Sequence, residues 1–252
     1  PAPSPLLVTL GLRLLPSTAL RKAFAEHVHV PLLADYFGRI EDVGRSWRRG
    51  RLDSSTAARA AHYSLGCAVH NSASYMASSL RSWGEQMFFL SLQQQEGAAA
   101  SAAASVTFFE VDRPGSVEGW RSSAKRMVAA LGDSIMDEIS EPLRLYVEAA
   151  AAQGVFWLGP SAGADSEGQA MQHAVAAVSE ELLVVLADLS AMLRQCNEEL
   201  SDRAQGALRR HVARQLDAYL FERMLCEMHC TRAGLEQLEQ DMSAVFGIFD
   251  VS

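Results

Sequence analysis

Hydrophobic residues recur at every third or fourth position along most of the sequence, the spacing that places side chains on one face of an α-helix. The pattern is clearest in residues 208–249, where Gly234 closes a short break between two helical stretches. We expect the second helix to fold back on the first as an αα-hairpin. The apolar positions are Leu208, Val212, Leu216, Tyr219 and Leu220, then Leu235, Leu238, Met242, Val245, Phe246 and Phe249. The predicted hairpin core is Leu216, Tyr219, Leu238, Met242, Phe246 and Phe249.

A second apolar stripe lies beside the first on the earlier of these two helices, at Phe221, Leu225 and Met228. A helix that is apolar on two faces is packed on both sides, so we expect it to lie inside a bundle. Helical spacing also predicts Leu6–Leu15, Thr18–Arg48, Ser55–Gln95, Val117–Ala152 and Gln169–Gln195.

Proline marks two expected irregularities in these helices. Pro31 should kink or restart its helix near Val30, and Pro142 should bend the helix in which it lies. The stretch Ser55–Gln95 would form a helix roughly 60 Å long. With roughly seven or eight helices and no credible sheet, the pattern predicts an all-α fold, an elongated stack of antiparallel helical bundles.

The low-complexity run Gly97–Ser105 and the Pro114-Gly115 pair interrupt the helical pattern. They predict an N-terminal helical bundle over residues 1–96, a loop insertion over residues 97–116, and a C-terminal bundle over residues 117–252.

Composition narrows the possible classes of function. The 252 residues are 49% hydrophobic and 21% charged, as in an ordinary folded protein, and the net charge of −8 argues against a nucleic-acid partner. Four cysteines in a chain of this length suit a reducing compartment better than a disulfide framework. The apolar run Leu6–Leu15 is interrupted by Arg13 and is too short to cross a bilayer. We therefore expect any membrane association to be indirect.

One basic cluster surrounds Trp47, at Arg45, Arg48, Arg49 and Arg51. We favour a solvated helix end as its explanation, because cations stabilise a helix C-terminus. The alternative is a docking patch for an acidic partner.

Candidate chemical sites are few. Cys226, His229 and Cys230 are close in sequence, but no second Cys/His pair stands near them, so we favour packing over zinc binding. We interpret His62, Cys67 and His70 in the same way. The sequence has no P-loop and no Asp-Asp pair. The Gly-x-Ser-x-Gly spacing occurs once, at Gly159, Ser161 and Gly163, but this Gly/Ser/Pro-rich stretch does not follow a predicted strand, as a nucleophile elbow would. We predict no catalytic, cofactor-binding or metal-binding residues, and no enzyme activity.

Two segments resemble the C-terminal region of the RINT-1/Tip20 family. The first has Trp83 with Phe88 and Phe89 in Leu80-x-x-Trp83-Gly84-Glu85-x-x-Phe88-Phe89-Leu90. The second has the family-signature residues Leu216, Asp217, Tyr219, Gly234, Leu238, Asp241, Met242, Phe246 and Phe249. The chain departs from the family pattern at Ala233-Gly234, where two glycines are usual, and it stops at Ser252 where members usually continue. We therefore expect a fragment or a shortened variant.

The resemblance implies a non-catalytic subunit of the Dsl1/NRZ vesicle-tethering complex, acting in Golgi-to-endoplasmic-reticulum retrograde transport. It implies ZW10/Dsl1-like and NAG/Sec39-like subunits and endoplasmic-reticulum SNAREs as partners. It also implies a cytoplasmic location, peripheral on the endoplasmic reticulum membrane, and a cell-cycle checkpoint role reported for members. The alternatives are a subunit of another helical-rod tether, of the exocyst or COG type, and an all-α enzyme or metal-binding domain.

Overall fold

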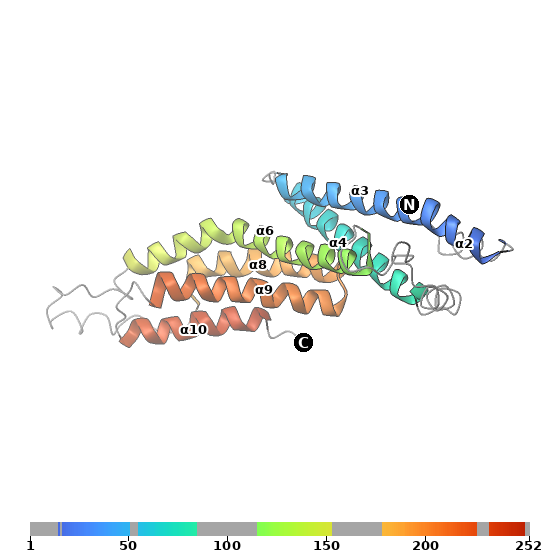
Figure 1. Cartoon of the computed structure of the whole chain (residues 1–252). Helices are drawn as coiled ribbons and strands as arrows, with labels where there is room; N and C mark the ends of the chain where they lie inside the picture. The colour runs from blue at the N-terminus through green and yellow to red at the C-terminus, as the bar shows by residue number, and fades with distance from the viewer. Residues whose placement is uncertain are drawn as a thin grey trace, which may run out of the picture. The chain divides into compact units, whose positions relative to one another are not determined.

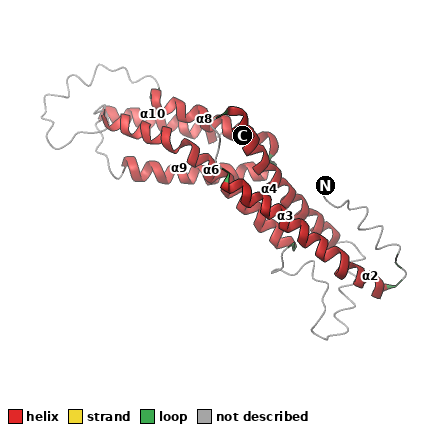
Figure 2. Ribbon diagram, turned by 90° about the horizontal axis from the view of Figure 1, so that it is seen from above, coloured by secondary structure: helices red, strands yellow, loops and turns green. Residues whose placement is uncertain are grey.

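The computed structural model describes residues 15, 17–50, 55–84, 115–152, 178–225 and 232–249. Every regular element in these residues is a helix, and no strand occurs among them (Figure 2). The predicted all-α class is therefore confirmed. Because helices satisfy most of their own backbone hydrogen bonds, their arrangement depends on packing between apolar faces.

The helices are labelled in Figure 1 in chain order. The earlier ones are α2 (Thr18–Phe24), the π-helical η1 (Ala25–His29), α3 (Val30–Arg49) and α4 (Thr56–Gly84). The later ones are α6 (Val117–Ala152), α8 (Glu180–Glu199), α9 (Asp202–Leu220), the π-helical η3 (Phe221–Leu225) and α10 (Arg232–Phe249).

The chain divides into two compact units, residues 1–128 and residues 129–252. The helix α6 contributes its first turns to the first unit and the rest of its length to the second. The predicted loop at 97–116 falls mostly in residues 85–114, outside the described residues, so its boundaries stay predictions.

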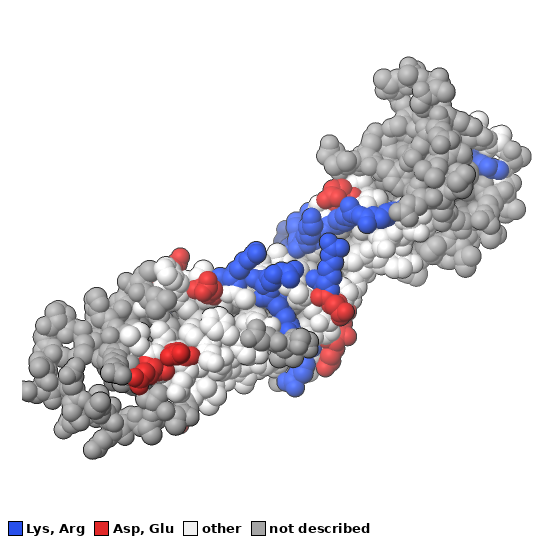
Figure 3. Space-filling view, turned by 90° about the horizontal axis from the view of Figure 1, so that it is seen from below, with Lys and Arg blue, Asp and Glu red and all other residues white. Residues whose placement is uncertain are grey.

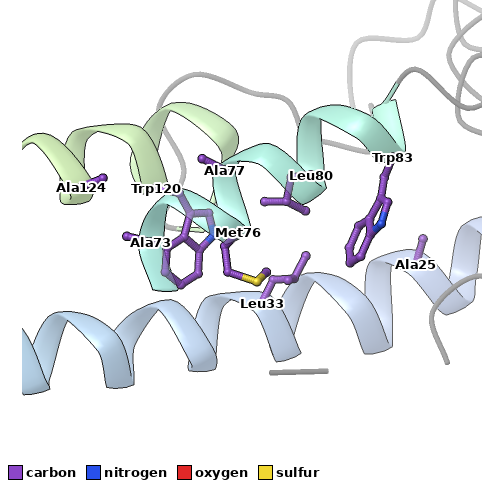
Figure 4. Packing of buried hydrophobic residues seen from close by; sticks show 9 residues of the cluster. All are labelled: Ala25, Leu33, Ala73, Met76, Ala77, Leu80, Trp83, Trp120 and Ala124. Atoms are coloured by element: carbon purple, nitrogen blue, oxygen red, sulfur yellow. The ribbon is translucent and has the colours of Figure 1, made fainter. Parts of the chain in front are cut away.

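The core of the first unit forms where α3, α4 and the start of α6 meet (Figure 4). Trp120 is fully buried there, with its ring centroid 4.8 Å from that of Phe37 and 5.6 Å from that of Tyr36. The signature residue Trp83 is buried in the same cluster. The buried members are Ala25, Leu33, Ala73, Met76, Ala77, Leu80, Trp83, Trp120 and Ala124.

Pro31 interrupts its helix as predicted. The α-helix α2 widens into the π-helical turn η1, and α-helical geometry resumes in α3 at Val30. Proline has no N–H to donate to the preceding turn, so a rearranged turn just before it is the expected response.

The basic cluster has the structure of a helix end. Trp47 is buried and donates from Nε1 to the His62 carbonyl oxygen at 2.7 Å, while Arg48 and Arg49 are exposed in the last turn of α3. Arg45 is paired with Asp42. The buried indole belongs to the core of the first unit, and Arg45, Arg48 and Arg49 occupy the solvated C-terminal part of α3, where cations are favourable. Arg51 lies outside the described residues.

The second unit contains most of α6 together with α8, α9 and α10, and α8 packs against both α9 and α10 (Figure 1). The predicted apolar stripes of α6, α8 and α9 are buried. They include Leu131, Ile135, Ile139, Leu143, Leu182, Val185, Leu189, Leu193, Leu208, Val212 and Leu216. The helix α6 continues through Pro142.

Two predictions about this unit need correction. The helix expected over Gln169–Gln195 is present from Glu180 onward, but it is not continuous, because Val178 and Ser179 are not helical. Residues 169–177 lie outside the described residues. The second apolar stripe predicted on the following helix is not buried at Phe221, whose exposed fraction is 54%. Phe221 begins the π-helical turn η3, where the wider turn shifts the side chains from their α-helical directions.

Candidate functional site

An apolar groove of about 220 Å³ lies between α9–η3 and α10 in the second unit. The residues of α9 and η3 that line it are Ala213, Leu216, Asp217, Leu220, Phe221 and Met224. Those of α10 are Leu238, Met242, Val245, Phe246 and Phe249. Asp217 is the one charged residue among them.

The groove has a buried floor and an exposed aromatic rim. Leu216, Met224 and Val245 are buried, whereas Phe221 and Phe246 on its two sides are 54% and 58% exposed. Leu235, near the start of α10, is also more than half exposed. Exposed aromatic side chains beside an apolar depression are typical of a surface that binds another molecule.

The groove stays open because α9 and α10 both pack against α8. The side of α10 that contains Leu238, Asp241 and Val245 is buried, while Met242 and Phe249 are half-buried and Phe246 is exposed. The apolar row of α10 that lines the groove therefore includes buried residues, Leu238 and Val245, and an exposed one, Phe246.

Asp241 fixes this orientation of α10. Its side chain is 0% exposed, and its carboxylate accepts hydrogen bonds from the Tyr146 hydroxyl at 2.9 Å, the Ser179 N–H at 2.9 Å and the Ser179 hydroxyl at 2.6 Å. Gln237, one turn earlier on α10, donates a further bond from Nε2 at 3.1 Å. Asp241 thus connects α10 to α6 and to the first residue before α8.

The position of this carboxylate is electrostatically favourable. Ser179 directly precedes α8, so Asp241 lies at the helix N-terminus, where the aligned peptide dipoles favour a negative charge. The donors are neutral, and together they replace the water that a buried carboxylate loses. Burial first, and then the negative charge of Asp241, raise the pKa of Tyr146 well above its usual range. Tyr146 therefore stays a hydrogen-bond donor at physiological pH.

The second unit is strongly acidic. Residues 129–252 contain 20 acidic and eight basic residues, a net charge of −12, whereas residues 1–128 contain 14 basic and 10 acidic residues. Around the groove, Asp217, Glu222 and Glu239 are exposed, and so are Arg214 and Arg223. Figure 3 shows one face of the molecule, on which side chains of both charges are exposed beside a broad uncharged surface.

The predicted signature residues fall in three places. Leu216, Asp217, Leu238, Met242, Phe246 and Phe249 line the groove, whereas Tyr219 is half-buried and is not among the lining residues. Gly234 is buried near the start of α10, and Trp83 belongs to the core of the first unit. Phe88 and Phe89 lie outside the described residues. That these residues form a family signature stays a prediction.

The predicted hairpin core needs one correction. Leu216 and Leu238 are buried, but Phe246 is the most exposed of the large hydrophobic residues in the described chain. The apolar stripe of α10 is wider than the surface that the other helices cover, so Leu238 and Val245 are buried while Phe246, on the same groove, is exposed. Sequence spacing could not show which edge would be covered.

The candidate metal ligands do not converge where the structure describes them. His62 stacks on Trp47, and His70 is buried with Nδ1 3.0 Å from the Ala124 carbonyl oxygen. Within the described residues, no group of three or more His, Cys, Asp or Glu side chains could hold a metal ion. Cys226, His229 and Cys230 lie outside those residues.

Sequence reasoning missed three residues that shape this site. Tyr146 and Ser179 are 95 and 62 positions away from Asp241, so helical spacing could not connect them. Phe221 was expected to be packed. Asp241 is a charged residue next to Met242 in the apolar stripe of α10. Its position was the one signal in the sequence that α10 forms hydrogen bonds with other helices.

The fold and the groove together define an all-α protein with a surface suited to a partner helix, since grooves between helices accept the apolar face of an amphipathic helix. The comparison with protein families agrees with this class. The RINT-1/TIP-1 family matches residues 7–252, and the chain belongs to this family. No curated protein matches the chain.

Family membership gives the chain a tethering-related role in transport between the endoplasmic reticulum and the Golgi. The family is one of tethering-complex subunits and is not known for enzymes. Among the described helices, none is both long enough and apolar enough to span a membrane.

Proposed function

We propose that this chain is a non-catalytic subunit of a Dsl1/NRZ-type vesicle-tethering complex in Golgi-to-endoplasmic-reticulum retrograde transport. Its partners are ZW10/Dsl1-like and NAG/Sec39-like subunits and endoplasmic-reticulum SNAREs. It acts in the cytoplasm, peripheral on the endoplasmic reticulum membrane, and its contact with that membrane is made through those partners.

The observation that supports this proposal most strongly is the family match over residues 7–252. The groove adds a physical means of binding. Burial of exposed Phe221 and Phe246 by a partner would remove apolar surface from water at two aromatic positions, the residue type that most often dominates binding energy.

The proposal is tested by affinity purification of the tagged full chain from a cell lysate, followed by mass spectrometry. The unmodified chain is compared with Phe246→Ser and with the matched control Leu183→Ser. Leu183 lies on α8, is 50% exposed and is not among the groove residues. Both substitutions exchange an exposed apolar side chain for serine, so their effects on folding should be small and similar.

We expect the unmodified chain and the Leu183→Ser variant to recover tether subunits or SNAREs, and the Phe246→Ser variant to recover several-fold less. If the unmodified chain recovers none of these proteins, the assignment to the complex is wrong. If Phe246→Ser recovers them in full, the complex assignment holds and the groove is not the surface that binds them.

A further inference from the structure

We infer that the groove between α9–η3 and α10 accepts a single amphipathic helix of a partner protein, with basic residues flanking its apolar face. This rests on the proposed function in one respect, because it takes the occupant to be part of another protein.

The apolar row of α10 sets the length of the occupant. The lining residues from Leu238 to Phe249 lie within 12 consecutive positions, which span about 16 Å along the helix axis. A partner helix that follows this row would place about three turns in the groove, with apolar residues at spacings of three and four. The rim residues Phe221 and Phe246, from opposite sides, would enclose its apolar face.

The exposed charged residues around the groove favour basic flanking residues, because three are acidic (Asp217, Glu222 and Glu239) and two are basic (Arg214 and Arg223). Asp217 lines the groove from α9, and Glu239 lies on α10 one turn before Met242. Both carboxylates are exposed, and no ion pair or hydrogen bond engages either of them among the described residues. Basic side chains beside the apolar stripe of the occupant would meet these carboxylates, and acidic side chains would be repelled.

The net negative charge of the second unit also favours a basic occupant of the groove. A net charge of −12 over residues 129–252 attracts a basic segment over a longer range than the contacts themselves. The same charge disfavours an anionic lipid surface, which attracts basic rather than acidic protein surfaces. A second copy of this chain is also disfavoured at the groove, because two copies of the same acidic unit would repel each other.

The experiment uses two labelled helical peptides of about 18 residues with identical leucine stripes. One has lysines beside the stripe, and the other has glutamates at the same positions. Binding to the full chain is measured by fluorescence anisotropy at low and at high salt. We expect the lysine peptide to bind roughly tenfold more tightly than the glutamate peptide at low salt, and the difference to shrink at high salt.

Charge-reversal variants test whether Asp217 and Glu239 cause the preference for the lysine peptide. The double variant Asp217→Lys/Glu239→Lys should lose or invert the preference between the peptides. The control Asp137→Lys/Glu198→Lys changes the net charge by the same amount at exposed positions that do not line the groove, and it should keep the preference. Phe246→Ser should weaken binding of the lysine peptide, with thermal melting used to confirm an unchanged fold.

Three results would overturn the inference. One is equal binding of the two peptides, another is a preference that the control variant loses as fully as the groove variant, and the third is binding that Phe246→Ser leaves unchanged. Self-association of the chain that Phe246→Ser abolishes would identify a second copy as the occupant instead. Recovery of tether subunits by the unmodified chain, together with failure of the peptide test, would reject this inference alone and leave the proposed function standing.

Discussion

At the scale of single residues, Asp241 shows how one buried charge fixes the position of a helix. Its carboxylate is fully buried and accepts bonds from the hydroxyls of Tyr146 and Ser179 and from the Ser179 N–H. A buried charge without donors would be far too costly, so α10 is stable only in the orientation that brings Asp241 to them. That orientation leaves Met242 and Phe246 toward the groove.

The Asp241 network can be tested by two substitutions that keep side-chain shape. Asp241→Asn exchanges one of the two carboxylate oxygens, an acceptor, for an NH2 group that faces other donors, and we expect a loss of about 2–3 kcal/mol of unfolding free energy. Tyr146→Phe removes one donor, and we expect a loss of about 1–2 kcal/mol. Chemical denaturation measures both values.

The double variant should lose less than the sum of the two single losses, because both residues belong to one network. Tyr75→Phe is the control for removal of a tyrosine hydroxyl, since Tyr75 is 52% exposed, and it should change stability by less than about 0.5 kcal/mol. An equally small effect of Tyr146→Phe would contradict the assigned role of the hydrogen bond.

At the scale of helices, α6 and α9 approach each other closely at Gly132. A Cβ atom at this position would lie 2.4 Å from Cδ2 of His211, a distance that requires something to move. The His211 ring is held in place by Asp133, whose Oδ1 is 2.8 Å from Nε2 of His211 and accepts a second bond from Gln215. Glycine at this position therefore leaves room for the His211 ring against α6.

We predict that Gly132→Ala destabilises the protein by about 1–3 kcal/mol, the usual cost of forcing extra volume into a packed interface. The matched control is Gly38→Ala in α3, where a Cβ would meet no atom within 4 Å. That control should stabilise the protein by about 0.5–1 kcal/mol, because alanine favours a helix interior over glycine. Equal effects of the two substitutions in denaturant melts would rule out the close contact.

At the scale of the whole molecule, residues 1–128 have a net positive charge and residues 129–252 have a net negative charge. The helix α6 belongs to both units. The first unit has two buried histidines, His29 and His70, and burial lowers the pKa of each. A hydrogen bond to the Ala124 backbone partly opposes this effect at His70. In the unfolded chain these histidines have their ordinary pKa of 6.5. Just below this pH, the unfolded state therefore binds more protons than the native state.

Stability should therefore fall with acidification. The contribution of the two histidines is complete above the ordinary histidine pKa of 6.5 and is lost as the pH falls below it toward the lowered native values. We expect the melting temperature to decrease between about pH 7 and pH 5.5, before most carboxylates titrate. Differential scanning calorimetry across this range measures the effect.

The variant His70→Gln keeps a polar side chain that cannot be charged, and it should show a weaker dependence on pH. His27→Gln is the control, because His27 is exposed in η1. A pH dependence that is unchanged in His70→Gln would show that other groups cause it. If the two units melt separately, the pH effect should appear in the transition of the first unit.

From the sequence alone, one can predict the all-α class, the positions of most apolar faces on the helices, and the interruption at Pro31. Each of these depends on local physics, because helical spacing is repeated within a few residues and proline acts on its own turn. The family resemblance also needed only the residues along the chain, and the match over residues 7–252 confirms it.

Which part of an apolar face becomes covered depends on how the helices pack together, and the pattern along the chain does not contain that information. The stripe of α10 contains Leu238, Met242 and Phe246, which all line the groove, and nothing in their spacing distinguishes the buried Leu238 from the exposed Phe246. The choice depends on Asp241 and on donors 62 and 95 residues away in sequence. Such long-range hydrogen bonds form only when the helices assemble, so the exposure of Phe246 is a property of the assembled bundle.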